Sequence, residues 1–231
     1  MKTAKLERVY VWQLPVRAFH WINAFCILVL GATGYLIGSP LAQRSSLEAS
    51  ASFWFGTVRF IHFATAYLLT FNFLVRIYYA FRGNPFAGWR NFLLVTPRQW
   101  REVFAVLRVD ILQLRSGPLE STGHNALASL TYFVSFLVFL VQVVTGFGLY
   151  AAMSRATIPG LFRWIVPLLG GDLSVRQLHH AMLWFFVLFT LVHVYLVAFH
   201  DYVEGRGVVS SMVGGWKFVE TEADRPKRPA G

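Results

Sequence analysis

Seven histidines occur in the 231-residue chain, and several of them lie inside long apolar runs. Ionisable side chains are costly inside a lipid bilayer, so a histidine there is a functional candidate. His179 and His193 are 14 residues apart. At 100° per residue, both imidazoles leave nearly the same face of a helix, roughly 21 Å apart along its axis. His180 points about 140° away from His193, so His179 is the better candidate of the adjacent pair.

Two imidazoles stacked on one helix can serve two haems at opposite sides of a bilayer. Each haem then needs a second ligand at a matching depth, which pairs His62 with His179 and His20 with His193. Imidazole at both axial positions leaves no open site for oxygen and is typical of electron transfer. We therefore expect two b-type haems, an outer one on the first pair and an inner one on the second.

Other residues on the same helical faces are suited to contacting a haem. Three glycines follow His20 near its face, where a macrocycle can approach the backbone: Gly31, Gly34 and Gly38. The same glycines can instead permit close helix packing. Arg76 lies on the face of His62, where its guanidinium can neutralise a haem propionate or anchor the helix at the lipid interface.

The elements that must position these residues are membrane helices. Residues are 56% hydrophobic and only 14% charged, against about 25% charged in soluble domains. Four apolar segments are long enough to cross about 30 Å of hydrocarbon: about 18–37, 54–81, 126–152 and 178–203. Backbone hydrogen bonding in lipid then requires helices. We expect an all-α bundle of four transmembrane helices in a single domain over residues 1–231.

Charge predicts the orientation of this bundle. Sixteen Lys and Arg residues fall on the side of both termini and five on the other, so the termini should be cytoplasmic. The net charge of +10 is spread between apolar runs, which favours lipid head groups over nucleic acid as the partner. The single cysteine, Cys26, excludes an internal disulfide and an iron–sulfur cluster held by four cysteines of this chain. We expect no cleaved signal peptide.

Three further segments have recognisable character. Residues 97–114 combine apolar positions at helical spacing with Arg and Trp, which predicts an amphipathic helix at the cytoplasmic interface. Residues 160–171 are too short to span and contain Pro167, which indicates a re-entrant or interfacial piece. Residues 221–231 are polar and should be a disordered tail.

Around the histidines, the sequence resembles the b-type cytochrome subunit of membrane-bound nickel–iron uptake hydrogenases. The likeness rests on long strings such as VYVWQLPVRAFHWINA, RFIHFATAY, VTGFGLY and LHHAMLWFFVLFTLVHVYLVAFHDYVEGRG. It implies a subunit that anchors a periplasmic large and small subunit pair to the bacterial inner membrane. Such a subunit takes electrons from the small subunit's iron–sulfur chain through both haems to quinone, and has no hydrogen-oxidising site of its own.

Quinone should then bind near the inner haem, at the cytoplasmic side. Three polar residues at that level are candidates: His124, Asn125 and His200. An imidazole can relay protons near neutral pH or hydrogen-bond a quinone oxygen, although all three residues can also be ordinary interfacial ones.

Two alternatives remain open at this stage. The same haem arrangement would serve the cytochrome b subunit of formate dehydrogenase or of another periplasmic dehydrogenase. A haem-free membrane anchor or transporter would also show four apolar helices.

Overall fold

The computed structural model describes residues 6–40, 53–84, 86–89, 97–106 and 126–220. It divides into two compact units, each described here by itself. The site unit comprises Phe19–Ile77 and Phe133–Val192. The terminal unit comprises Met1–Ala18, Tyr78–Tyr132 and His193–Gly231.

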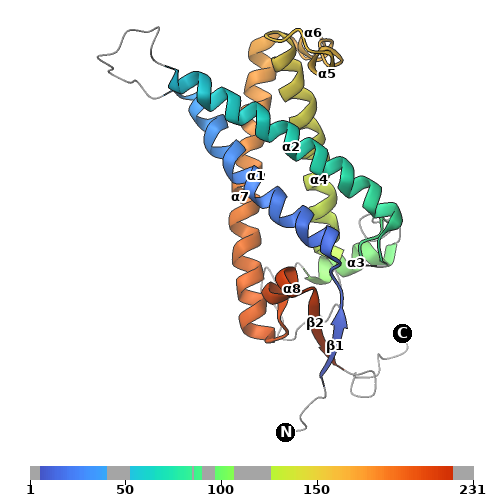
Figure 1. The fold of residues 1–231 in the computed structure, drawn as a ribbon. Helices are drawn as coiled ribbons and strands as arrows, with labels where there is room; N and C mark the ends of the chain where they lie inside the picture. Colours follow the sequence, from blue (N-terminus) through green and yellow to red (C-terminus); the bar gives the residue numbers. More distant parts are fainter. Residues whose placement is uncertain (1–5, 41–52, 85, 90–96, 107–125, 221–231) are drawn as a thin grey trace. The chain divides into compact units, whose positions relative to one another are not determined.

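Four long helices dominate the chain: α1 (Leu14–Gly38), α2 (Trp54–Arg82), α4 (Ala126–Ala151) and α7 (Asp172–Glu204) (Figure 1). All four are long and apolar enough to cross a membrane. Large apolar side chains remain exposed along them; Phe60 is 71% and Leu188 63% exposed. Such surfaces suit lipid rather than water. The predicted fold class, a mostly helical protein with four membrane-spanning helices, is confirmed.

Two of the four long helices, α1 and α7, extend beyond the apolar runs that predicted them. Helix α7 begins at Asp172, not near residue 178, because Asp172 and Arg176 form an ion pair one turn apart that stabilises a polar first turn. Gly170 and Gly171, which precede it, have φ values of 84° and 105°. Helix α1 begins at Leu14 rather than near residue 18, with Pro15 in its first turn, where a missing N–H costs nothing.

The core of the site unit is a small aromatic cluster. Its buried members are Cys26 of α1, Leu69 and Phe73 of α2, and Phe139 of α4. The ring centres of Phe73 and Phe139 are 4.3 Å apart, a separation at which aromatic pairs attract one another. Phe186 of α7 packs against the same cluster. All four helices therefore contact one another through this cluster, which lies about two to three turns after His62 along α2.

Two single-turn helices connect α4 to α7 within the site unit. They are α5 (Thr157–Gly160) and α6 (Ile165–Leu168), which lie beside the ends of the two long helices (Figure 1). Pro159 and Ile165 are buried, while Leu161 and Leu168 are exposed. The connection is thus folded; its predicted interfacial or re-entrant position stays a prediction.

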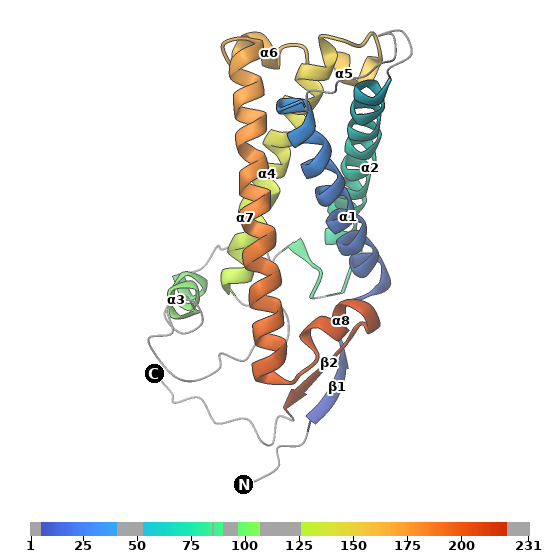
Figure 2. The ribbon, with the colours of Figure 1, turned by 90° about the vertical axis from the view of Figure 1, so that its left-hand side faces the viewer.

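The terminal unit contains a structure that the sequence did not predict. Strand β1 (Leu6–Tyr10) pairs antiparallel with β2 (Trp216–Glu220), and helix α8 (Val208–Gly214) packs against β2 (Figure 2). Tyr10 and Trp216 are register partners with ring centres 5.0 Å apart. Such a pairing between the two ends of the chain has no signal in local periodicity.

The terminal unit also contains α3 (Pro97–Val106). Val103 is buried, whereas Trp100 and Phe104 are exposed. The described helix covers the first part of the predicted amphipathic segment; residues 107–114 lie outside the described residues, as does the predicted tail. Its interfacial position stays a prediction.

Candidate haem site

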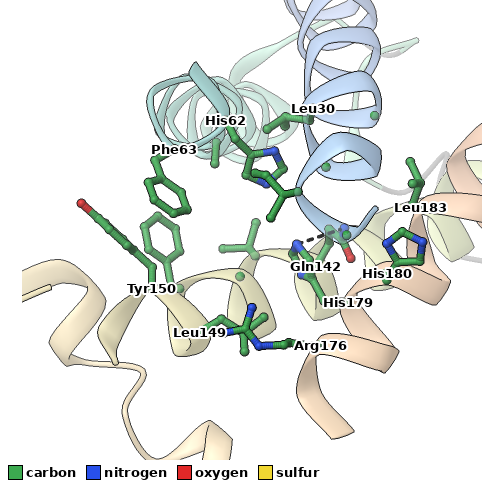
Figure 3. A pocket seen from close by; sticks show the side chains of 18 of the residues that line it. Leu30, His62, Phe63, Gln142, Leu149, Tyr150, Arg176, His179, His180 and Leu183 are labelled. Atoms are coloured by element: carbon green, nitrogen blue, oxygen red, sulfur yellow. Dashed lines mark hydrogen bonds between the residues drawn. The ribbon is translucent and has the colours of Figure 1, made fainter. Parts of the chain in front are cut away.

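A cavity of about 850 Å³ lies among α1, α2, α4 and α7 in the site unit (Figure 3). Most of its lining is apolar. Eight side chains bring nitrogen groups to it: Arg59, His62, Gln142, Arg176, Gln177, His179, His180 and Trp184. A large apolar cavity with a few convergent polar groups is the usual form of a cofactor site.

His62 and His179 meet in this cavity. Their ring centres are 6.5 Å apart. A metal ion bound between two imidazoles, with bonds of about 2 Å, separates the ring centres by roughly 6 Å, so the spacing suits a shared metal. His62 lies eight residues after the start of α2 and His179 seven after the start of α7. Both are therefore roughly 10–12 Å along their helices; their predicted match in depth within the bilayer stays a prediction.

Glycines provide the room in which these rings lie. A Cβ atom added to Gly34 would be 3.3 Å from Cε1 of His62. One added to Gly146 would be 3.0 Å from Cε1 of His179. Real Cβ atoms are rarely so close to a neighbour, so a side chain at either position would displace the ring. The structure thus places Gly34 at the predicted site and adds Gly146, which sequence reasoning did not select.

The other two glycines of α1 face α7. Gly31 approaches Leu183, and a Cβ added to Gly38 would be 2.8 Å from the ring of His180. All three α1 glycines also line the cavity. His180 therefore packs against α1, whereas its neighbour His179 meets His62.

Each of the two central histidines contacts a buried threonine. Oγ1 of Thr33 is 2.9 Å from Nδ1 of His62. Oγ1 of Thr145 is likewise 2.9 Å from Nδ1 of His179. Thr33 is 8% and Thr145 1% exposed, so both bonds are shielded from solvent.

Gln142 lies on the other side of His179. Its amide nitrogen is 3.5 Å from Nε2 of that histidine (Figure 3), and its buried Oε1 has no hydrogen-bond partner among the described residues. A buried amide oxygen without a partner is uncommon. This part of the cavity therefore contains an acceptor that no described protein group satisfies.

Two arginines line the cavity one turn before the histidines. Arg59 precedes His62 by three residues, and Arg176 precedes His179 by three. Among the described residues, Arg59 contacts only the Met153 sulfur and the Phe63 ring. Neither group neutralises a guanidinium, so this cation can accept an anionic group entering the cavity.

Arg76 was predicted at the cytoplasmic end of its helix, 14 residues after His62, where it would neutralise a haem propionate or anchor the helix. It does not line the cavity; it is buried, with its guanidinium carbon 5.9 Å from the centre of the Phe19 ring. Because Phe19 directly precedes His20, Arg76 lies near the start of α1, the helix that carries this predicted ligand of the inner haem.

The structure does not test the remaining candidates. His20 belongs to the site unit and His193 to the terminal unit, so their pairing stays a prediction. His124 and Asn125 lie outside the described residues. His200 bonds to its own helix, with Nδ1 2.7 Å from the Leu196 carbonyl oxygen.

Two short patterns could have revealed the residues that sequence reasoning missed. The string Val-Arg-x-x-His occurs three times, as VRAFH, VRFIH and VRQLH, ending at His20, His62 and His179. The pair Thr-Gly occurs three times in the chain, and two of these pairs lie in α1 and α4, as Thr33–Gly34 and Thr145–Gly146. Neither recurs at a fixed period, so a search for regular repeats does not find them.

These residues suit a haem on chemical grounds. Two imidazoles supply axial ligands, glycines leave space for a flat macrocycle, and arginines can neutralise propionates. The predicted role of His62 and His179 is therefore compatible with every contact of the cavity.

Comparison with known proteins agrees with this chemistry. The family described as prokaryotic cytochrome b561 matches residues 11–215. A protein of Azotobacter vinelandii named "Probable Ni/Fe-hydrogenase B-type cytochrome subunit" is 41% identical over 97% of this chain and 94% of its own length. A protein of Cupriavidus necator with that name is 39% identical, over 92% of this chain and 88% of its own. The Escherichia coli K12 "Probable Ni/Fe-hydrogenase 1 B-type cytochrome subunit" is 34% identical, over 90% of both chains.

Proposed function

The chain belongs to the prokaryotic cytochrome b561 family, and from this premise we propose that it is a two-haem membrane subunit of a nickel–iron hydrogenase. In this proposal it carries electrons from the iron–sulfur small subunit, on the periplasmic side, to membrane quinone. The main observation behind the proposal is that the rings of His62 and His179 lie close together in one cavity, where Gly34 and Gly146 leave room for them.

His62 and His179 would hold the outer haem. Haem, when bound, would supply a one-electron carrier, and the two imidazoles would hold its iron. Arg59 and Arg176 would neutralise its propionates, since both line the cavity one turn nearer the helix starts.

His20 and His193 would hold the inner haem. Arg76 lies beside Phe19, next to His20, and would serve this second site. The hydrogenase partner is inferred from the names of relatives that match nearly the whole chain. The cytoplasmic termini are inferred from the charge distribution, and the inner-membrane location is inferred from the family resemblance.

The test is haem content and reduction by hydrogen in the complex purified with its partner subunits. We expect two low-spin haems per chain by pyridine haemochrome assay, both reduced by hydrogen and reoxidised by quinone. A chain without haem would instead be a passive anchor or transporter. Co-purification with formate-oxidising subunits, and reduction by formate instead of hydrogen, would favour the formate dehydrogenase alternative.

Quinone would bind near the inner haem on the cytoplasmic side, with His124, Asn125 and His200 as candidate contacts. His124→Ala, alone and together with His200→Ala, tests this placement in preparations that retain both haems. Hydrogen should still reduce both haems while hydrogen-to-quinone turnover collapses. Turnover that survives in the double variant would place the quinone site elsewhere.

A further inference from the structure

The Thr33–His62 contact determines which nitrogen of the imidazole carries its proton. A threonine hydroxyl has a single proton to donate. Thr33 donates it to the Val29 carbonyl oxygen, 2.7 Å away on its own helix. The hydroxyl oxygen can therefore only accept at its contact with Nδ1 of His62, 2.9 Å away. Nδ1 of His62 then carries the proton, and the lone pair is left on Nε2.

The Thr145–His179 contact repeats this arrangement on a different pair of helices. Thr145 donates to the Val141 carbonyl oxygen at 2.6 Å, so its oxygen accepts from Nδ1 of His179 at 2.9 Å. Gln142 gives an independent sign of the same tautomer: its amide nitrogen, a donor, lies 3.5 Å from Nε2 of His179, where it faces the lone pair.

Each threonine is followed by the glycine that admits the same ring. Thr33 holds Nδ1 of His62 while Gly34 leaves room beside Cε1. Thr145 and Gly146 do the same for His179. The hydroxyl contact at Nδ1 sets the tautomer of the imidazole. Together with the glycine beside Cε1, it also sets the position of the ring.

We propose that Thr33 and Thr145 are positioning residues that hold His62 and His179 with Nε2 available to haem iron. This inference rests on the proposed haem-binding function. Histidine ligands are generally oriented by a hydrogen bond at the nitrogen opposite the metal, and that bond makes the imidazole a stronger electron donor. A stronger donor favours ferric over ferrous iron, so the two threonines lower the reduction potential of the outer haem.

The experiment compares Thr33→Val and Thr145→Val with Thr33→Ser and Thr145→Ser in the purified complex. Valine keeps the shape and removes the hydroxyl, whereas serine keeps the hydroxyl. Loss of such a contact weakens metal binding roughly 10-fold to 100-fold, so the valine variants should lose outer haem during haem-competition assays. If ferric binding weakens tenfold more than ferrous binding, the midpoint potential rises by about 59 mV. The serine variants should match the wild type in both measurements.

Thr57→Val is the matched control. Thr57 lies on α2 and makes the same bond to its own helix, with Oγ1 3.1 Å from the Phe53 carbonyl oxygen, but it is exposed and does not line the cavity. Its replacement should leave haem affinity and potential unchanged. If a valine variant does not accumulate, Thr→Ala and Thr→Ser at the same position make the comparison.

The outcomes separate this inference from the proposed function. A wild-type chain that binds no haem overturns the proposed function. A wild-type chain with two haems, together with valine or alanine variants of unchanged affinity and potential, overturns only the role of the threonines. Serine variants as defective as the valine variants would also overturn it, because the hydroxyl would then not be responsible.

Discussion

The pattern Val-Arg-x-x-His has different surroundings at His62 and His179 than at His20. At the outer site, Arg59 and Arg176 line the cavity that contains His62 and His179. Near the start of α1, Arg17 precedes His20 by the same three residues, but its guanidinium donates to the backbone carbonyl of Val213, near the end of α8. The arginine of this five-residue pattern therefore lines the cavity in two places and is hydrogen-bonded to Val213 in the third.

The difference shows that the surroundings of each histidine depend on the side chains of the helix that faces it. His62 and His179 each meet a Thr-Gly pair from another helix within one structural unit. The predicted inner pair, His20 and His193, is divided between two units. At His62 and His179 the hydroxyl and the space beside the ring therefore come from a facing helix, and the Val-Arg-x-x-His pattern alone does not predict them.

The largest effect is expected from His179→Ala, compared with His180→Ala. Only His179 meets His62, while His180 packs against Gly38. His179→Ala should reduce haem from two per chain to one and stop electron delivery, whereas His180→Ala should retain two. Haem content and hydrogen-to-quinone turnover measure both. Loss of haem with His180→Ala alone would show that the adjacent histidine is the ligand.

His193→Ala should also remove one haem, but with a different consequence. The outer haem remains, so hydrogen should still reduce half of the wild-type haem while quinone reduction stops. Optical spectra recorded under hydrogen distinguish this result from that of His179→Ala, in which delivery to the remaining haem fails. Two haems in the His193→Ala variant would contradict the predicted inner pair.

Gly34→Ala and Gly146→Ala should have a smaller, graded effect. The added methyl group would lie 3.3 Å from His62 in one case and 3.0 Å from His179 in the other, so each ring must shift away from its position. Partial outer-haem occupancy is expected, lower for Gly146→Ala. Gly56→Ala on α2, where the added methyl meets no atom within 4 Å, should retain full occupancy. Equal occupancy in all three variants would show that the glycines do not limit the site.

The sequence predicted the four helices because they depend on local composition, whereas the pairing of His62 with His179 was predicted from matched depths on two separate helices. Apolar length indicated the spans, and helical phase separated His179 from His180. The contacts of Thr33, Thr145 and Gly146 were missed because they join different helices, and no rule of spacing within one helix relates them. The pairing of β1 with β2 was missed for the same reason, since Leu6 and Glu220 are register partners from opposite ends of the chain.

Arg59→Gln should have the smallest effect of the four changes, a shift in the outer-haem potential without loss of haem. Arg59 has only a thioether and an aromatic ring as partners among the described residues, whereas Arg176 is already paired with Asp172. Removing the positive charge beside the propionates should favour ferric iron and lower the midpoint potential, on the order of 60 mV for a tenfold change in equilibrium. Arg176→Gln should lower it less, because Asp172 already offsets that charge.

Arg163→Gln, which lies outside the cavity lining, is the control for a general change in surface charge. Redox titration of the purified complex measures all three, and equal shifts in the three variants would mean that Arg59 acts at long range instead of within the site.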